Sequence, residues 1–421
     1  ITNLQNKIIR LNENIEYLNS YLDRAKPYGE DILIKKNLSD LNFEKIKSEF
    51  NFNGKKIKIE KFQNLNPFLR GIYRDMPGSA YIEVYENKLF IISTIGIFGY
   101  SKINKNEENL NFKQIDNNFN DFLNINHFRR NKTYAVRDLK IYNDKIFVSY
   151  NEEVKQDCWA TGLLWAELNF KEINFKKLFS PKECVEENNI DGEFNASQSG
   201  GRIAFIDNEN LVLSIGDYRL RFLPQNKNSL FGKIIKFNLK EKKITLISMG
   251  HRNPQGLIFD EDKNILISTE HGPRGGDEIN IIKLEQNLIP NYGWPIASYG
   301  EHYPVKEAHG DTADESKNIE KYKKYPLLKS HNINGFVEPI EYFVPSIGPS
   351  QIIKINETSY FFTSLRDKSL YYFQLDEENK LKNEIERFKI GERIRDITKY
   401  NDTFYMYLED TGSIVKFTIK N

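Results

Sequence analysis

The stretch GLIFDEDKNILISTE (256–270) holds two short apolar segments on either side of a charged turn. Alternating apolar residues lead into the turn, and a compact apolar run that ends near Ser and Thr leaves it. Alternation marks a half-buried strand, and a polar cluster between two such runs marks a hairpin turn. The stretch therefore predicts a β-hairpin.

The same pattern recurs along the chain. The other copies are IEVYENKLFIIST (82–94), DLKIYNDKIFVSY (138–150), RIAFIDNENLVLSIGD (202–217), QIIKINETSYFFTSL (351–365) and IRDITKYNDTFYMYLED (394–410). Their spacing, roughly 40 to 95 residues, is near the blade length of propeller repeats. Six copies predict an all-β fold, a six-bladed β-propeller, because a β-sandwich would not repeat one unit six times. The long gap between the fourth and fifth copies, with Trp294 and residues 301–329, predicts an excursion on the functional face.

The amino-acid composition favours strands and gives no electrostatic reason to expect a nucleic-acid partner. The 421 residues include 29 Phe and 23 Tyr, which favour strands over helices. The net charge is +1, with 60 basic and 59 acidic residues interspersed, so no basic face for nucleic acid is expected. No apolar run approaches the roughly 18 residues that span a bilayer. The sequence starts at Ile1 without Met, which fits a signal peptide or membrane anchor that was removed or left out.

Residues 1–26 follow a different pattern. Apolar residues recur at alternating steps of three and four, at Ile1, Leu4, Ile8, Leu11, Ile15, Leu18 and Leu22. This heptad predicts a helix that forms a two-stranded coiled coil and so a homodimer. An amphipathic helix lying on its own domain is the alternative. Residues 27–69 are expected to connect this helix to a propeller over residues 70–421.

The propeller fold predicts where functional side chains gather. Each blade begins with the strand that lines the channel, so residues just before each hairpin should converge at one mouth. These residues are Arg74, Ser79, Tyr134, Arg137, Gln198, Ser199, Arg202, Arg252, Asn253, Gln255, Ser346, Ser350, Gln351, Arg393 and Arg395. Several guanidinium groups at one mouth favour an anionic ligand such as a carboxylate or phosphate. In the alternative, each arginine pairs with a neighbouring acid such as Asp138 or Asp396.

Three motifs around the fourth hairpin are rich in oxygen donors and glycine. They read GHRNPQG (250–256), EHGPRGGDEIN (270–280) and NYGWP (291–295). Such loops suit Ca²⁺, which takes six to eight oxygen ligands in flexible geometry. The alternative is a set of solvated acidic turns.

These motifs, with RIRD at 393–396, resemble the soluble aldose dehydrogenases of the glucose/sorbosone dehydrogenase family. The resemblance covers roughly residues 70–420 and implies a six-bladed propeller that uses pyrroloquinoline quinone (PQQ) with Ca²⁺. It implies that the quinone is bound by Arg252, Asn253, Tyr292, Arg366, Arg393 and Arg395. It implies calcium ligands at Glu270, at the carbonyls of Gly272 and Pro273, and at Asn280. The family also contains non-enzymatic members.

One position departs from the family pattern. In NASQSGGRIAF (195–205), Gln198 stands where the family has its general-base His. An amide cannot take a proton from a sugar hydroxyl at neutral pH, and a general base contributes roughly a hundredfold to ten-thousandfold. Asp138 or His302 is the substitute base to test.

The two cysteines, Cys158 and Cys184, predict one disulfide and an oxidising, periplasmic compartment. Two free buried thiols are the alternative.

The leading hypothesis is oxidation of an aldose sugar or related alcohol by hydride transfer to PQQ, with electrons passed to an unidentified acceptor. The rival is a non-catalytic propeller that binds an anionic ligand, a carbohydrate or a protein. A calcium-dependent hydrolase of the lactonase type is a third hypothesis.

Overall fold

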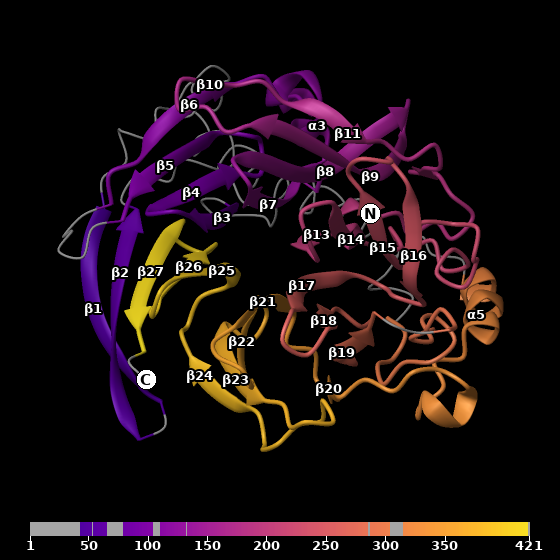
Figure 1. Cartoon of the computed structure of the whole chain (residues 1–421). Coiled ribbons are helices and arrows are strands. Elements are labelled where there is room, and N and C mark those ends of the chain that lie inside the picture. Colours follow the sequence, from indigo (N-terminus) through magenta and orange to yellow (C-terminus); the bar gives the residue numbers. More distant parts are fainter. Residues whose placement is uncertain are drawn as a thin grey trace, which may run out of the picture.

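The computed structural model describes residues 43–52, 54–64, 79–103, 110–131, 133–284, 287–303 and 315–419. Six sheets stand around a central axis (Figure 1), so the chain is a six-bladed β-propeller and the predicted fold is confirmed. The helix and coiled coil predicted for residues 1–26 lie outside the described residues.

The blades follow one another in sequence order. Blade 1 contains β3 (Ala80–Tyr85), β4 (Lys88–Ser93), β5 (Phe98–Lys102), β6 (Lys113–Asn117) and β10 (Glu172–Ile173). Blade 2 contains β7 (Val136–Tyr142), β8 (Lys145–Lys155), β9 (Cys158–Glu167), β11 (Lys176–Phe179) and β12 (Val185–Glu186). Blade 3 contains β13 (Gly200–Phe205), β14 (Asn210–Ile215), β15 (Lys233–Asn238) and β16 (Ile244–Met249).

The second half of the ring is built in the same way. Blade 4 contains β17 (Pro254–Asp260), β18 (Ile265–Glu270), β19 (Asp277–Lys283) and β20 (Glu341–Phe343). Blade 5 contains β21 (Pro349–Lys354), β22 (Ser359–Ser364), β23 (Ser369–Gln374) and β24 (Glu386–Lys389). Blade 6 contains β25 (Ile394–Tyr400), β26 (Thr403–Leu408), β27 (Ser413–Thr418), β2 (Lys55–Asn64) and β1 (Phe43–Phe52).

Blade 6 is completed by strands from the start of the chain. β2 pairs antiparallel with β27, with Ile59 opposite Phe417 and Phe62 opposite Ile414. Residues 27–69, expected to be a connection, therefore include two strands of the propeller. Ile57, Ile59 and Phe62 are buried in this sheet, which is the physical reason the segment joins it.

The innermost strand of every blade contacts those of both neighbouring blades, in the order β3, β7, β13, β17, β21, β25 and back to β3. Aromatic rings fill the space between blades. Phe361 of blade 5, for example, packs edge-on against Phe404 of blade 6 at 5.4 Å between ring centroids. This radial packing fixes which residues meet at the channel.

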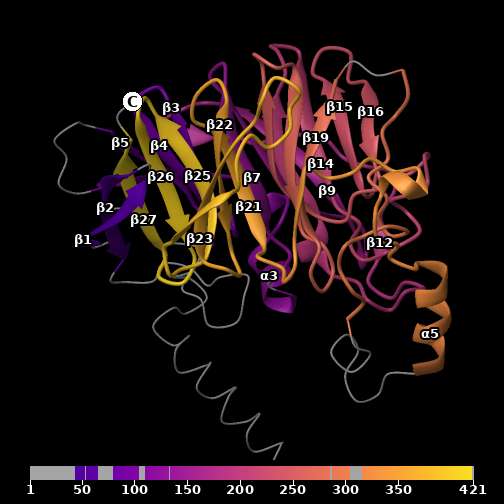
Figure 2. The ribbon, with the colours of Figure 1, turned by 90° about the horizontal axis from the view of Figure 1, so that it is seen from below.

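The helices in the described part of the chain are short and lie in the loops between strands. They are η3 (Phe119–Asp121), α3 (Ile125–Arg130), η4 (Ala196–Gln198), α5 (Glu315–Lys324) and η5 (Asn332–Asn334). Figure 2 shows α3 and α5 on the same face of the propeller, and α5 belongs to the predicted excursion. Among the described helices, none is both long and apolar enough to cross a membrane.

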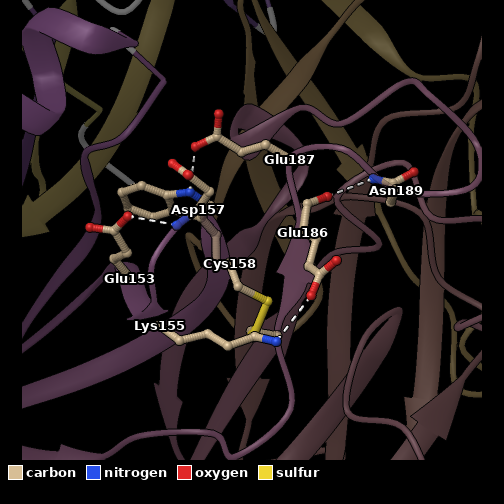
Figure 3. The surroundings of a disulfide bond; sticks show 9 residues. Glu153, Lys155, Asp157, Cys158, Glu186, Glu187 and Asn189 are labelled. Carbon is tan, nitrogen blue, oxygen red and sulfur yellow. Dashed lines mark hydrogen bonds and ion pairs between the residues drawn. A yellow bond between two sulfur atoms is a disulfide. The ribbon is translucent and has the colours of Figure 1, made fainter.

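A disulfide joins Cys158 at the start of β9 to Cys184, just before β12, with a sulfur–sulfur distance of 2.09 Å. The predicted pairing is confirmed. Figure 3 shows the bond beside the ion pair of Lys155 with Glu186 at 3.0 Å. The bond holds the outer edge of blade 2 to the segment that leads into η4.

Candidate ligand site at the channel mouth

The side chain of Arg202, which comes from β13 and is 1% exposed, closes the centre of the channel. Its Nη1 donates to Asp138 Oδ1 at 2.8 Å and to Asp396 Oδ1 at 3.0 Å. Its Nε and Nη2 donate to the carbonyls of Gln255 and Arg395. Arg202 thus joins blades 2, 3, 4 and 6, and the predicted pairing of arginines with acids is correct for this residue.

Asp138 is unsuited to be the substitute base. Its Oδ1 accepts from Arg202, and its Oδ2 accepts from the Ile203 backbone N–H at 2.8 Å. The residue is 1% exposed, so a substrate at the mouth cannot reach a carboxylate oxygen that is free to take a proton.

Arg393 and Arg395 share one carboxylate at the mouth. Arg395 Nε donates to Glu409 Oε1 at 2.6 Å, and Arg393 Nε donates to Glu409 Oε2 at 3.1 Å. Ser79 Oγ also donates to Glu409 Oε1, at 2.5 Å. Although burial raises the pKa of Glu409, the charges of Arg395 and Arg393 lower it to about 2. Glu409 thus holds two guanidinium groups side by side at the mouth. Arg74, also predicted at the mouth, lies outside the described residues.

Arg252 lies over the loop that follows β18. Its Nη1 donates to the carbonyls of Gly272 at 2.7 Å and His271 at 3.1 Å. Its guanidinium carbon lies 5.3 Å from the centroid of the Trp294 ring, a cation–π contact. Close packing of this loop requires Gly272, because a Cβ there would lie 2.1 Å from the carbonyl oxygen of Gly276.

His271 marks the point around which three of the predicted cofactor residues gather. Burial, together with the charges of Arg252, Arg395 and Arg393, lowers the pKa of His271 to about 3. The neutral ring is hydrogen-bonded through Nε2 to the carbonyl of Pro349 at 2.7 Å. Arg252 reaches the His271 carbonyl directly, and Arg395 is linked to the His271 ring through Gln255 and Asn253.

Asn253 ties blade 4 to blade 3 below this group. Its Oδ1 accepts from the backbone N–H of Gly200 at 3.0 Å and from Gln255 Nε2 at 3.1 Å. Its Nδ2 lies 3.4 Å from His271 Nδ1. The amide is 1% exposed, so its described role is to hold the mouth together.

Gln198, in η4, is 8% exposed. Its Oε1 is buried without a hydrogen-bond partner among the described residues, and its Nε2 lies 3.5 Å from Ser197 Oγ. An unpaired amide acceptor can receive a hydrogen bond from a ligand hydroxyl. It cannot accept the proton itself.

Tyr292 lies deeper than its predicted position beside a cofactor. It is 1% exposed, stacks on His251 at 4.7 Å and donates its hydroxyl to the carbonyl of Ile281 at 2.6 Å. It belongs to the apolar core between blades 3 and 4. In the NYGWP turn, the ring that contacts Arg252 is that of Trp294. The predicted contact of Tyr292 with a cofactor stays a prediction.

Arg366 is exposed on the loop after β22, where its backbone N–H donates to the carbonyl of Ile347 at 3.0 Å. No hydrogen bond or ion pair joins its side chain to another described residue. The structure does not bring Arg366 into contact with the other predicted cofactor residues.

A pair of buried carboxylates lies on neighbouring strands of blade 4. Glu270 of β18 is directly opposite Glu278 of β19, and Ser268 is opposite Asn280. Burial raises the pKa of Glu270 to about 8 and the pKa of Glu278 well above its usual value. Asn280 Oδ1 and Ser268 Oγ are buried without a hydrogen-bond partner in the described chain.

These side chains fit a hard cation such as Ca²⁺. Coordination to the ion would offset the free-energy cost of burying two carboxylates and an amide oxygen that has no hydrogen-bond partner. Glu278 belongs to the oxygen-rich motif predicted to suit Ca²⁺, but it was not among the ligands that the family resemblance implied. Asp277 accepts instead from the backbone N–H groups of Gly272, Ile347 and Gly348. In the part of the chain that the structure describes, no three or more His, Cys, Asp or Glu side chains converge as a metal site.

Sequence reasoning did not single out Arg219, which follows Asp217 and Tyr218 after β14. Tyr218 and Arg219 have φ values of 51° and 64°, in the left-handed region. Such residues cost about 1–3 kcal/mol each and need support from their surroundings. Asp217 supplies it, since its Oδ1 accepts from the Arg219 N–H at 2.8 Å and its Oδ2 from Trp294 Nε1 at 2.7 Å. The sequence feature that could have pointed to Arg219 is the Gly-Asp-Tyr-Arg segment, a turn at the end of the third predicted hairpin.

The excursion is fastened to the mouth by a buried ion-pair network. Glu193 forms ion pairs with Arg221 Nη1 at 2.6 Å and with Lys321 Nζ of α5 at 2.6 Å. His302 stacks on Tyr322 of α5 at 3.9 Å, and its Nε2 is hydrogen-bonded to the carbonyl of Tyr325 at 2.8 Å. This network holds residues 301–303 beside blade 3.

Together these observations describe a propeller with several arginines at its channel mouth and a pair of buried carboxylates in blade 4. The family model for glucose/sorbosone dehydrogenases matches residues 140–416, and the chain belongs to this family. The resemblance seen in the sequence motifs is thereby confirmed.

The chain shares less than 30% sequence identity with the individual relatives described next. The chain is 27% identical over 302 residues to the aldose sugar dehydrogenase YliI of Escherichia coli, covering 66% of this chain and 74% of that protein. It is 29% identical over 244 residues to the uncharacterized protein slr1608 of Synechocystis, covering 51% and 54%. The chain thus spans about half the length of the Synechocystis relative.

Solved structures share the fold. The apo aldose sugar dehydrogenase of Escherichia coli superposes with a TM-score of 0.59 at 20% identity, over 82% of this chain and 96% of that chain. The PQQ-bound aldose sugar dehydrogenase of Streptomyces coelicolor gives 0.57 at 17% identity, over 82% and 95%.

Proposed function

We propose that this protein oxidises an aldose sugar or a related alcohol with PQQ and Ca²⁺. The observation that carries the proposal is the meeting of Arg252, Arg393 and Arg395 at one mouth. Arg393 and Arg395 share Glu409, Arg395 also contacts Gln255 of blade 4, and Arg252 contacts the His271 carbonyl. Three guanidinium groups at one mouth suit a ligand with several carboxylates. The names of the relatives support the same reaction class.

The chain's own residues would bind and orient the reactants. Arg252, Arg393 and Arg395 would hold the carboxylates of the quinone. The carbonyls of Gly272 and Pro273 would ligate Ca²⁺ beside it, and Glu270, Glu278 and Asn280 would ligate Ca²⁺ in blade 4. When bound, the quinone supplies a two-electron acceptor and Ca²⁺ supplies a Lewis acid.

The proton of the substrate hydroxyl needs an acceptor other than Gln198. Since both oxygens of Asp138 are occupied, His302 is the remaining residue of the two substitutes predicted from the sequence. Its Nε2 is hydrogen-bonded to a carbonyl, and its Nδ1 has no hydrogen-bond partner among the described residues. Burial lowers the pKa of His302, so the ring is neutral and able to accept.

The disulfide supports an oxidising compartment such as the periplasm. A homodimer through residues 1–26 and a membrane anchor ahead of Ile1 stay predictions, and the electron acceptor is not identified.

Titration of the purified protein with PQQ, with and without Ca²⁺, tests the proposal. We expect stoichiometric binding, followed by dye-linked oxidation of sugars. Arg393→Ala with Arg395→Ala should weaken quinone binding by roughly a hundredfold or more, because two charge-assisted contacts are lost. Arg387→Gln, an exposed arginine paired with Asp367, is the matched control and should bind normally. Absence of quinone binding by the unmodified protein would favour the non-catalytic propeller.

A further inference from the structure

Arg219 lies at the rim of the mouth, between blade 3 and the excursion. Its guanidinium carbon is 5.5 Å from the centroid of the Tyr303 ring. The Tyr303 hydroxyl donates to the carbonyl of Pro273 at 3.4 Å. The preceding carbonyl, that of Gly272, accepts from Arg252. Tyr303 therefore spans the distance between the two arginines on one side of the mouth.

The charges of Glu193 and Asp217 offset part of the positive charge of Arg219. No ion pair to Arg219 occurs among the described residues, and its Nε is buried without a hydrogen-bond partner. Two residues on, Arg221 differs, because Glu193 pairs with it at 2.6 Å. Both arginines border Asp217, which accepts from the Arg219 backbone N–H at 2.8 Å and donates its own backbone N–H to the Arg252 carbonyl at 2.9 Å.

The backbone is bent to present this side chain. Tyr218 and Arg219 both adopt left-handed φ values, held by Asp217 and by the carbonyl of Gln198, which accepts from the Tyr218 N–H at 3.0 Å. Strain of this kind, fixed by surrounding contacts, is concentrated at ligand sites. Tyr218, the residue before Arg219, is thereby hydrogen-bonded to Gln198, where the resemblance places the family's general base.

We propose that Arg219, with Arg252, forms a subsite for an anionic group on the substrate, so that the preferred substrates are acidic sugars. A planar guanidinium binds a carboxylate or phosphate through two parallel hydrogen bonds. The Tyr303 ring offers a flat apolar face beside it for a sugar ring. This inference rests on the proposed function, and it goes further by naming the substrate class.

The test compares D-glucose, D-glucuronate and D-glucose 6-phosphate on the PQQ- and Ca²⁺-loaded protein. We expect a higher kcat/KM for an acidic sugar than for glucose. Arg219→Asn should raise the KM of the acidic sugar about tenfold to a hundredfold and leave the KM of glucose nearly unchanged. Asn is chosen because it tolerates a left-handed φ. Arg219→Lys should restore part of the preference, and Arg387→Gln should resemble the unmodified protein.

Calorimetric titration without turnover separates the two proposals. Binding of glucuronate or glucose 6-phosphate that is lost in Arg219→Asn supports the subsite even if no oxidation is detected. The tighter of the two ligands assigns the group as carboxylate or phosphate. Equal loss for neutral and acidic sugars, or a preference for glucose in the unmodified protein, would overturn the inference. A loss of PQQ affinity in Arg219→Asn would also overturn it, by assigning Arg219 to the cofactor.

Discussion

At the scale of single residues, the arginines at the channel mouth differ in the groups that they contact. Arg202 is committed to Asp138 and Asp396 and holds the channel closed. Arg393 and Arg395 share Glu409, and the Arg252 guanidinium contacts the Gly272 carbonyl and the Trp294 ring. Replacing Arg202 should therefore lower the stability of the fold, whereas replacing Arg252 should weaken binding of the quinone.

Gln198 is the residue whose replacement tests catalysis most directly. If the missing base is the only defect, Gln198→His should raise the rate of sugar oxidation by roughly a hundredfold, because a general base is restored. The measurement is dye-linked oxidation at saturating PQQ and Ca²⁺. Gln374→His, on the outer part of blade 5, adds the same ring elsewhere and should have no effect.

No gain in Gln198→His would leave His302 as the base in question. His302→Gln should then lower kcat about tenfold or more while quinone affinity stays the same. Unchanged kcat in that variant would remove His302 from the mechanism.

At the scale of elements, α5 is anchored by Glu193 at the edge of the mouth. Although burial raises the pKa of Glu193, Arg221 and Lys321 lower it to about 2. A carboxylate whose folded pKa lies below its unfolded pKa stabilises the fold above the unfolded value, 4.5, and loses that stabilisation as the pH falls toward 2. The shift corresponds to on the order of 3 kcal/mol at neutral pH.

We therefore expect the free energy of unfolding to fall more steeply between pH 5 and about pH 2 in the unmodified protein than in Glu193→Gln. Chemical denaturation at a series of pH values measures this difference. Glu378→Gln is the control, because its ion pair with Lys380 is exposed and contributes little. Identical pH profiles for Glu193→Gln and the unmodified protein would contradict the assignment.

The disulfide joins two elements, β9 and β12, across 26 residues. Loop-closure entropy predicts that Cys158→Ser with Cys184→Ser costs roughly 3 kcal/mol of stability. Urea unfolding measures this, and a reducing agent should destabilise the unmodified protein by a similar amount. The double variant should not respond to the reducing agent, and a response there would point to another cause.

At the scale of the whole molecule, the ring is closed by pairing β2 with β27. Phe62, which is 1% exposed, packs against Tyr405, Tyr407 and Ile414 between blades 6 and 1. Phe62→Ala should cost about 3–5 kcal/mol, because a buried ring is removed from the closure. Phe222→Ala, at a site 47% exposed, should cost far less. Similar midpoints of thermal unfolding for the two variants would show that β2 does not close the ring.

The sequence by itself determined the repeating part of this protein. Alternation and turn residues act over a dozen positions, so six hairpins, the six-bladed fold and the motifs around Arg252 and Glu270 could be read directly. The pairing of Cys158 with Cys184 was also predicted correctly.

Only the tertiary structure decided which charges meet. Arg202 and Asp396 are 194 residues apart, and no local pattern shows that they pair while Arg252 faces the mouth. The same holds for the strands that close blade 6, for the burial of Tyr292, for Glu278 opposite Glu270 and for Arg219. In a propeller, each blade is encoded locally, whereas the channel mouth is formed where separate blades converge.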